Sequence, residues 1–578
     1  MRLKNYIPIL QWLPNYDKKK MRADLIAGLT SGIMIVPQAM ACALIAGLPP
    51  IYGLYASLIP LIVYAFFGTS MQLAVGPVAI VSMLVMAGVG KFAEPETELF
   101  IQLAIFTGLL AGLMQLAMGI LRLGVLVNFL SHPVLSGFTS AAALIIGLTQ
   151  FKYFLGIEIP RSNYIHEIVW NIGLHIQETH LLTLSIGIGG IILIQLLKKI
   201  HPVFPSALVT IIISTLAVYG FGWSEMGVNT IGEIPKGLPH FSIPSFTFEH
   251  FNQLIPIAIT IGLISFIESI AIAKTMESKH KNYKIDPNQE LIALGLSKLM
   301  GSFFQAFPTT GSFSRTSIND KAGAQTNIAG LISVVFVALV LMFLTPLLYY
   351  MPKTILASII MISVAGLIDL QEPKYLFRSD RSDLIMLVIT FFATLIMGIG
   401  TGILMGILLS LGEVIYRSTK PHMTVLGQLP NTVYYRNVKR YPEALKRKDM
   451  LIIRFDAELY FANVNHFKDT LETFINEKGN HLKVIILEAS SIHALDSTGM
   501  HTLEEVIEEC AQKGISFYFT GVIGPVRDAF YKGKLISTIG RENQFMRVHD
   551  AVEYFDEITQ SRIAEKNFKI ALQTNYGK

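Results

Sequence analysis

Long apolar runs separated by short polar connections fill the first two thirds of the chain. About 20 consecutive apolar residues are enough for one membrane-spanning helix. Runs of this kind begin near Ala23, Ile51, Ile101, Val125, Leu181, Ser206, Leu254, Leu291, Ile328, Thr354, Leu384 and Ile399. The pattern predicts an α-helical polytopic membrane protein.

Two further apolar segments are shorter and are broken by glycine, proline or serine. They cover residues 76–89, which open with Gly-Pro, and residues 311–321, which open with Gly-Ser. Counting both gives fourteen segments, in which the short ones are third and tenth and so occupy matching places in two sets of seven. Such pairs indicate a seven-plus-seven inverted repeat with two half-helices and a binding site at the breaks. Ordinary proline-kinked helices are the alternative.

After about residue 420 the pattern changes to short strands and amphipathic helices. Strands are expected at residues 451–455, 458–461, 484–487 and 517–520, and helices at residues 465–477, 497–512 and 525–532. This alternation predicts a small α/β domain. Asp496 is expected to cap the second helix and Gly514 to close it.

Composition separates these two parts further. Charged residues make up 15% of the 578 residues, against roughly 25% in soluble domains. We expect four parts, namely a cytosolic N-terminal segment (1–20), a transmembrane transport domain (21–420), a cytosolic domain (421–565) and a C-terminal tail (566–578). The only cysteines are Cys42 and Cys510, so neither a disulfide framework nor a cysteine metal site is expected.

Basic residues gather in alternate connections, as the positive-inside rule requires. With the N-terminus in the cytosol, the inner segments hold Lys18–Arg22, Arg122, Lys198, Lys199, Lys274, Lys279, Lys281, Lys284, Lys321, Arg378 and Arg381. The outer loops hold mainly acidic residues, with a minority of basic ones, Lys91, Lys152, Arg161 and Lys236. The pattern predicts fourteen crossings of a cell inner (plasma) membrane with both termini cytosolic. Nothing in it indicates nucleic-acid binding.

Two charges fall inside predicted spans. Glu268 is the only ionisable group between residues 251 and 273, and exposing it to lipid would cost roughly 2.5–3.5 kcal/mol. We therefore expect it to face a cavity; a structural glutamate paired with a neighbouring helix is the alternative. Arg315 follows the second break, in the first turn of a short helix whose free N–H groups point into a pocket. A snorkelling arginine at the membrane interface is the alternative there.

These groups suggest how an anion is held. Gln38, after Pro37 in the first span, offers a neutral donor and acceptor, although a glutamine bonded to its neighbours is an equal alternative. Two helix N-termini supply roughly +0.5 each, and Arg315 adds a full positive charge. The sum suits a dianion or a monovalent oxyanion. Because an ionised Glu268 would oppose the anion and a protonated one would not, we hypothesise proton coupling.

Several motifs resemble the SulP family of sulfate permeases and related anion exchangers. They are PPIYGLYAS at 49–57 with GTS at 68–70, VPQAMA at 36–41, DPNQEL at 286–291 and GSFSRT at 311–316. The resemblance implies two inverted seven-helix repeats and a homodimer. It also implies an anion site at Gln38, the backbone of Val78 and Ala79, Ser314 and Arg315, with Glu268 at the carboxylate position used for cation coupling.

Four positions depart from that family pattern. Cys42 stands where an aromatic residue often lines the pocket, and Met71 replaces the basic residue that usually ends the signature. Ile272 stands where sodium-coupled bicarbonate carriers have a hydroxyl, and Glu268 replaces their aspartate. Since hard cations need several oxygen ligands, the departures favour proton over sodium coupling.

The tail resembles a STAS domain, the sulfate-transporter and anti-sigma-antagonist module. The segment from Leu487 to Met500 carries the resemblance, and Ser497 occupies the place of the serine that is phosphorylated in antagonist relatives. A phosphate at a helix N-terminus would be stabilised, but a simple helix start is the favoured interpretation. Neither part of the chain shows a catalytic triad, a metal cluster or a phosphate-binding glycine loop, so we expect no enzyme, cofactor or metal.

The sequence thus predicts a secondary active transporter of inorganic anions, sulfate by preference, in proton symport. Its expected partners are the anion, protons, the lipid bilayer, a second copy of the chain and a cytosolic regulator at the STAS domain. The alternatives are a bicarbonate uptake carrier, a chloride or anion exchanger, an anion channel and, from another class, a membrane scaffold or sensor. The anion, the transport mode, the coupling ion, the regulator and the conformational state stay open.

Overall fold

The computed structural model describes residues 7–125, 131–159, 162, 164–200, 205–233, 235–244 and 248–575. Some positions used above lie outside these residues, namely 1–6, 126–130, Arg161 and 576–578. Contacts divide the chain into two compact units, Met1–Leu411 and Gly412–Lys578. Each unit is described by itself.

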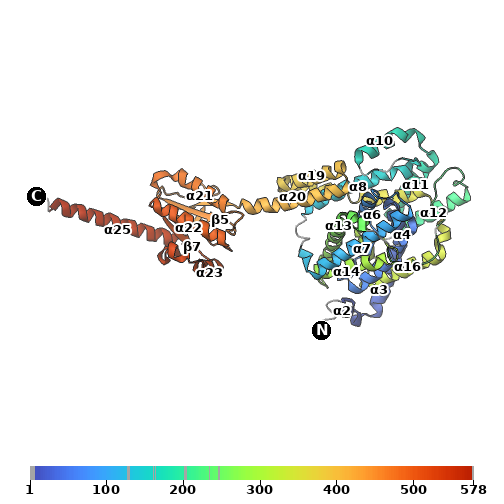
Figure 1. Cartoon of the computed structure of the whole chain (residues 1–578), viewed down its shortest axis with the longest axis horizontal. Helices are drawn as coiled ribbons and strands as arrows, with labels where there is room; N and C mark the ends of the chain where they lie inside the picture. Colours follow the sequence, from blue (N-terminus) through green and yellow to red (C-terminus); the bar gives the residue numbers. More distant parts are fainter. Residues whose placement is uncertain are drawn as a thin grey trace. The chain divides into compact units, whose positions relative to one another are not determined.

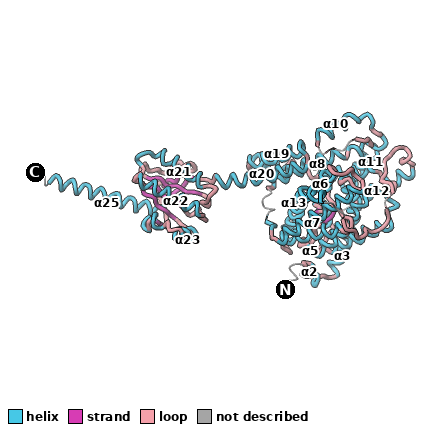
Figure 2. The backbone as a smooth tube through the Cα atoms, viewed as in Figure 1, coloured by secondary structure: helices cyan, strands magenta, loops and turns pink. Residues whose placement is uncertain are grey.

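The first unit is almost entirely helical (Figures 1 and 2). Its longer helices are α3 (Lys18–Ile45), α7 (Glu98–Ile120), α8 (His132–Thr149), α11 (Leu181–Ile200), α12 (Ser206–Gly220), α13 (Phe248–His280), α14 (Pro287–Ser302), α16 (Ile328–Leu339), α17 (Lys353–Ala365), α19 (Arg381–Met397) and α20 (Ile399–Thr419). Its shorter ones are α2 (Ile9–Trp12), α4 (Pro50–Tyr55), α5 (Ile59–Phe67), α6 (Ala79–Val89), α9 (Phe151–Leu155), α10 (Ile165–His175), α15 (Phe313–Lys321) and α18 (Gln371–Ser379).

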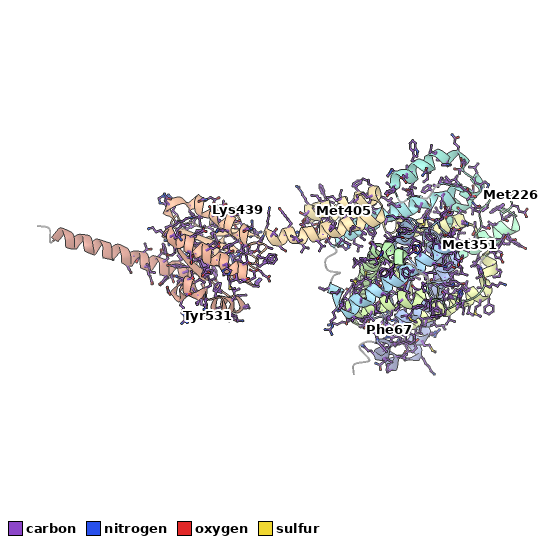
Figure 3. All side chains as sticks on the ribbon, viewed as in Figure 1. Phe67, Met226, Met351, Met405, Lys439 and Tyr531 are labelled. Atoms are coloured by element: carbon purple, nitrogen blue, oxygen red, sulfur yellow. The ribbon has the colours of Figure 1, made fainter. Side chains whose placement is uncertain are left out.

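Among the described residues, eight helices are long and apolar enough to cross a membrane, and three more are apolar but shorter. Several of them expose apolar side chains, such as Met405 on α20 (Figure 3). The prediction of a polytopic α-helical protein is confirmed.

Three expected spans differ in detail from the structure. The second is divided into α4 and α5 at Leu58, just before Pro60. The fifth begins at His132 rather than near Val125. A proline at the second helical position, Pro133, favours the start of α8 at His132. The eleventh continues from α16 into a π turn and a 3₁₀ turn that ends at Leu348. Helices α10 and α18 were not expected.

The two short segments are built as predicted. Strand β1 (Val75–Gly76) pairs antiparallel with β2 (Thr310–Gly311), and α6 and α15 follow these strands directly. Each of the two strands therefore leads into its own half-helix, α6 or α15. The alternative of proline-kinked helices is wrong. The pairing satisfies backbone groups that lipid cannot satisfy.

The second unit is a mixed six-stranded sheet with helices on it (Figure 2). Its strands are β3 (Met423–Gln428), β4 (Tyr435–Asn437), β5 (Met450–Phe455), β6 (Val484–Glu488), β7 (Ser516–Thr520) and β8 (Gln544–Phe545), in the order β4-β3-β5-β6-β7-β8. β5 to β8 run parallel, and β3 is antiparallel to both of its neighbours. The helices are α21 (Val464–Lys478), α22 (Ser497–Gln512), α23 (Gly524–Lys532), α24 (Ile536–Ile539) and α25 (Val548–Asn575).

Helices cover both faces of this sheet. Along β6, Ile485 belongs to the core formed with α21 and α22, whereas Ile486 belongs to the core that includes Val552 of α25. A strand buried on both faces has a continuous apolar sequence, which explains why β6 was predicted. Asp496 caps α22 by accepting a hydrogen bond from the Gly499 N–H (2.7 Å), and Gly514 has φ +72°, as expected.

The expected strand at residues 458–461 is wrong. Leu459 makes only an isolated bridge with Leu495 in the part of the chain that is described. The reason is the buried Asn463, whose Oδ1 accepts from the Tyr460 N–H (3.1 Å) and whose Nδ2 donates to the Glu458 carbonyl (2.8 Å). These side-chain bonds turn the backbone and compete with strand pairing.

Helices α7 and α14 pack closely because glycines face each other between them. A Cβ atom added to Gly295 would lie 2.6 Å from the backbone nitrogen of Leu116, and one added to Gly112 would lie 2.7 Å from that of Leu299. Small residues at such positions let helix backbones approach within a membrane.

We expect Gly295→Ala to lower the thermal midpoint of the detergent-purified protein, because the new methyl group must push α7 away, at a cost of about 1–3 kcal/mol. Gly189→Ala is the matched control, since its Cβ would meet no heavy atom within 4 Å. Equal midpoints for the two variants would contradict this description of the packing.

Candidate functional site

The two half-helices begin side by side, next to the β1–β2 pair. Helix α6 follows Val78 with no side-chain cap, and α15 follows Ser312, whose Oγ accepts from the Arg315 N–H (3.4 Å). The first N–H groups of a helix have no partner within the helix. Both helix starts therefore offer backbone donors at the same place.

A cavity of about 90 Å³ lies at these helix starts, and we call it the central cavity. Its lining includes five of the six residues predicted for the anion and coupling sites, Gln38, Val78, Ala79, Glu268 and Ser314. Residues from α3, α13 and α17 complete it, among them Cys42 and Ser363. The volume holds several waters or one small oxyanion.

Arg315 is the predicted residue that does not line this cavity. Its side chain is 1% exposed, and its Nη2 donates to the Pro77 carbonyl (2.9 Å). Its Nε and Nη1 have no hydrogen-bond partner among the described residues. A Cβ at Gly76 would lie 3.0 Å from Nη1, so the glycine permits this close approach. The guanidinium is thus buried behind the start of α6, and the alternative of a snorkelling arginine does not hold.

Glu268 lines the cavity from α13, where hydrogen bonds fix that helix against β2. Ser269 Oγ accepts from the Gly311 N–H (2.8 Å) and bonds to Thr310 Oγ1 (2.9 Å). Thr310 Oγ1 also donates to the Ser265 carbonyl (2.8 Å). Glu268 Oε2 is buried with no partner among the described residues, so it is available to a proton or a solute.

A buried lysine, which the sequence analysis missed, extends this network. Lys298 of α14 is 2% exposed, and its Nζ donates to Gln115 Oε1 (2.9 Å). Gln115 Nε2 in turn donates to the Gly262 carbonyl (2.7 Å) and to Ser265 Oγ (2.9 Å). The signal was present, because Lys298 is an ionisable residue inside the predicted ninth span, as Glu268 is in the eighth.

A second, larger cavity of about 310 Å³ adjoins the central one, and we call it the inner cavity. Gln38, Ser314 and Ser363 line both. The inner cavity also carries Lys198, in the last turn of α11, and Lys321, at the end of α15. The central cavity thus lies next to a basic cavity on the side where the inner connections are expected.

The remaining predicted residue lies in the second unit. Ser497 is the first residue of α22 and is exposed, next to the capping Asp496. In the described part of the chain, no group of three His, Cys, Asp or Glu side chains is placed to hold a metal ion. Cys42 and Cys510 are both free and buried.

Comparison with known proteins decides the family. The profile of the Sulfate permease family matches residues 21–390, and that of the STAS domain matches residues 441–551. The chain belongs to the sulfate permease family. This member is 40% identical to Sulfate transporter 4.1, chloroplastic, of Arabidopsis thaliana, over 97% of its own length and 84% of the relative's. It is 33% identical to High affinity sulfate transporter 1 of Stylosanthes hamata, over 95% and 86%.

Solved structures agree with this assignment. SLC26A9 superposes with a TM-score of 0.88 at 25% identity, covering 100% of this chain and 95% of that one. The murine Slc26a9 anion transporter in the inward-facing state gives 0.89 at 26% identity. The transmembrane domain of the cyanobacterial bicarbonate transporter BicA gives 0.60 at 21% identity over 69% of this chain, which shows a shared fold.

The family resemblance and the fold class predicted from the sequence are therefore confirmed, with a helical transmembrane domain and a C-terminal STAS domain. Membership makes the chain a multi-pass membrane transporter of anions and not an enzyme. This outcome also decides against the alternative of a membrane scaffold or sensor.

The Lys298–Gln115 pair gives a test of the network behind the site. We expect Gln115→Leu to lower the thermal midpoint, because it leaves the buried Lys298 Nζ without its hydrogen-bond partner, at a cost of about 1–3 kcal/mol. Lys298→Met should cost much less, and the double variant should regain most of the stability lost in Gln115→Leu. Additive losses in the double variant would mean that the two side chains are not coupled.

Proposed function

We propose that this family member is a secondary active transporter of inorganic oxyanions, sulfate by preference, coupled to protons. The observation that carries the proposal is that two half-helix N-termini open onto one cavity, with a buried guanidinium directly behind one of them. The relatives that match almost the whole chain are sulfate transporters, which favours sulfate among small oxyanions.

The donors at the cavity suit an oxyanion better than a spherical or apolar solute. Backbone N–H groups at Val78 and Ala79, together with Ser314 and Gln38, can donate to oxygens that point in several directions. Helix N-termini favour negative charge. Arg315 adds a positive charge that lacks a full set of partners among the described residues, and such a buried charge is best compensated by an anion.

Glu268 is the residue that we propose couples proton and anion. It lines the same cavity as the donors, so an ionised carboxylate would repel the anion that they attract. Protonation removes this repulsion, and the anion therefore binds together with a proton. Ile272, one helical turn after Glu268, supplies no oxygen ligand, and the loss of one such ligand makes a sodium site poorer.

The topology is part of the proposal. We place residues 21–420 in a cell inner (plasma) membrane as the transport domain, with residues 1–20, the STAS domain (421–565) and the tail (566–578) in the cytosol. The resemblance also implies a homodimer and a cytosolic regulator at the STAS domain. Because Asp496 already caps α22, a plain helix start is our favoured account of Ser497; its phosphorylation would be seen directly by mass spectrometry of the native protein.

In proteoliposomes we expect sulfate uptake to be driven by an inward proton gradient and to be insensitive to a sodium gradient. Glu268→Gln should bind sulfate but lose the dependence on the proton gradient, since glutamine mimics the protonated acid. Glu233→Gln, on an exposed loop, is the control and should behave as the native chain. An unchanged proton dependence in Glu268→Gln would remove Glu268 from the coupling role. Faster uptake of bicarbonate or chloride than of sulfate would overturn the substrate assignment.

We expect Arg315→Gln to raise the half-saturating sulfate concentration about tenfold, because it removes a buried positive charge next to the start of α6 that attracts the anion through a low-dielectric environment. Arg315→Lys should lose less, since it keeps the charge but not the planar donor set. Sulfate-dependent thermal stabilisation of the purified variants measures binding without transport. Equal stabilisation of the native chain and Arg315→Gln would contradict the role of this charge.

A further inference from the structure

A pair of buried hydroxyl groups joins α13 to β2. Ser269 and Thr310 are both fully buried, and their side-chain oxygens lie 2.9 Å apart. Thr310 Oγ1 donates its proton to the Ser265 carbonyl (2.8 Å), which can only accept. Ser269 must therefore donate to Thr310, while its own Oγ accepts from the Gly311 N–H (2.8 Å). Each hydroxyl thus makes one bond as a donor and one as an acceptor.

This hydroxyl pair differs from buried hydroxyls that bond within their own helix. Ser297 on α14, for example, donates to the Ala293 carbonyl (2.7 Å), four residues earlier, as serine often does in helices. The equivalent acceptor for Ser269 is the Ser265 carbonyl, but Thr310 uses it. Both hydroxyls of the pair therefore connect two separate elements instead of supporting one helix.

The pair joins the helix that carries Glu268 to the segment that starts the second half-helix. Ser269 directly follows Glu268 on α13, and Gly311 directly precedes Ser312, the N-cap of α15. A Cβ atom added to Gly311 would lie 3.0 Å from Ser269 Oγ, so the glycine permits this close approach. The link therefore fixes the backbone at Glu268 relative to the helix start that offers donors to the anion.

The carboxylate of Glu268 is not held in place by contacts of its own. Its Oε2 has no hydrogen-bond partner among the described residues. The ionisable groups near it come from other elements, namely the Cys42 thiol of α3 in the same cavity and the Arg315 guanidinium of α15, which bonds to a backbone carbonyl instead. Lys298 of α14 reaches α13 only through a glutamine of α7. The position of the carboxylate thus depends on how α13 is held.

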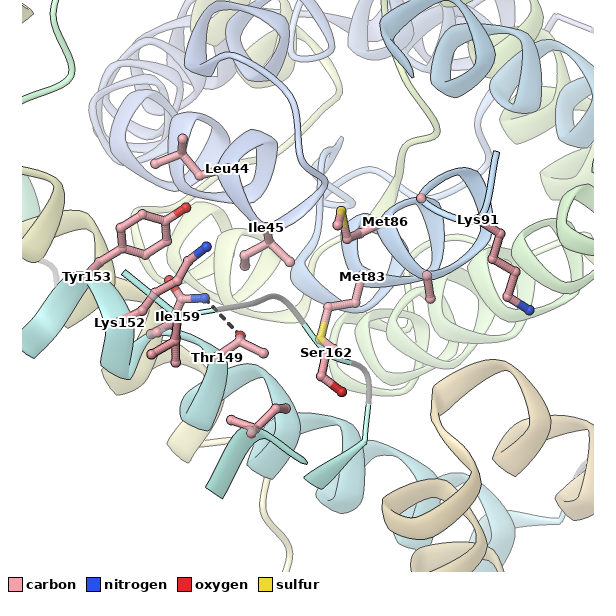
Figure 4. Close-up of a pocket in the computed structure, with 14 residues that line it drawn as sticks. Leu44, Ile45, Met83, Met86, Lys91, Thr149, Lys152, Tyr153, Ile159 and Ser162 are labelled. Carbon is pink, nitrogen blue, oxygen red and sulfur yellow. Dashed lines mark hydrogen bonds between the residues drawn. The ribbon is translucent and has the colours of Figure 1, made fainter. Parts of the chain in front are cut away.

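Much of the surface around the carboxylate is apolar. Helix α17 lines the central cavity with Ile359, Ile360, Val364 and Leu367. Ile45 of α3 lines both this cavity and a further one, whose lining includes Met83 and Met86 of α6 (Figure 4). Like charges repel more strongly in such surroundings than in water, and the repulsion weakens as they move apart. The separation between Glu268 and the anion therefore decides how strongly an ionised Glu268 opposes binding.

We propose that Ser269 and Thr310 are positioning residues for proton coupling. Their hydroxyl link holds Glu268 at a fixed distance from the anion, so that the anion binds only when Glu268 carries a proton. The inference rests on the proposed function. Without the link, α13 can move away from β2, and the carboxylate gains both distance and water. An ionised Glu268 then repels the anion less, and sulfate crosses without a proton.

The test measures coupling in proteoliposomes. The coupling ratio is the rate of sulfate uptake with an inward proton gradient divided by the rate at a uniform alkaline pH. We expect Ser269→Ala and Thr310→Val each to lower this ratio by roughly threefold to tenfold, the range that corresponds to one lost hydrogen bond. The change should come mainly from faster uptake without the gradient, because the ionised carboxylate no longer excludes the anion.

Sulfate binding to the purified variants gives a second measurement, which a general structural defect would affect differently. As the pH rises, thermal stabilisation by sulfate should fall less in Ser269→Ala and Thr310→Val than in the native chain. At acidic pH, where Glu268 is protonated, sulfate should stabilise all three to the same extent.

Matched variants separate positioning from folding. Thr310→Ser keeps the hydroxyl group and should keep the native coupling ratio. Ser297→Ala and Thr107→Val remove buried hydroxyls that donate to a carbonyl of their own helix, so both should also behave as the native chain.

An unchanged coupling ratio in both Ser269→Ala and Thr310→Val would overturn the inference. Weaker stabilisation by sulfate at acidic pH in these variants would do so too, because it would indicate a general structural defect. Failure of the proposed function is distinguishable, since the native chain and Glu268→Gln would then give the same coupling ratio.

Discussion

The need to satisfy backbone hydrogen bonds inside a membrane controls the architecture of this protein. A helix that begins at mid-depth leaves N–H groups without partners, and lipid supplies none. The chain meets this constraint by pairing β1 with β2 over two residues on each side and by directing both new helix starts at one cavity. The unsatisfied donors that remain are the groups that an oxyanion requires.

Two buried basic side chains around this cavity are tied to the same backbone arrangement. Arg315 reaches the Pro77 carbonyl across the strand pair, and Lys298 is joined through Gln115 and Ser265 to the helix that carries Glu268. A charge removed from water is costly unless it is paired and hydrogen-bonded. The positions of these groups therefore depend on the close packing of α7, α13 and α14, and the site is a product of the whole fold rather than of a single motif.

Most of the helices of the first unit could be predicted from long apolar runs, because a membrane-spanning helix requires about 20 consecutive apolar residues and few other structures do. The half-helices were also visible, since glycine and proline interrupted two runs at matching places. Glu268 and Gln38 stood out because each is polar within an apolar run, whereas Ser314 was named only from the family resemblance. The placement of Arg315 behind α6, rather than in the cavity, could not be predicted, because it depends on the absence of a side chain at Gly76 in another segment. The strand expected at 458–461 failed for a similar reason, since the buried Asn463 redirects its backbone.

The central cavity shares Gln38, Ser314 and Ser363 with the inner cavity, which also carries Lys198 and Lys321. The central claim of this account is that the anion replaces its water with backbone donors at two neighbouring helix starts. A structure of the protein with selenate, located by the anomalous signal of selenium, tests it most directly. We expect the selenium atom between Ala79 and Ser314, with oxygens within hydrogen-bond distance of both helix starts. Selenate bound elsewhere in the transport domain, with the central cavity empty, would contradict the account.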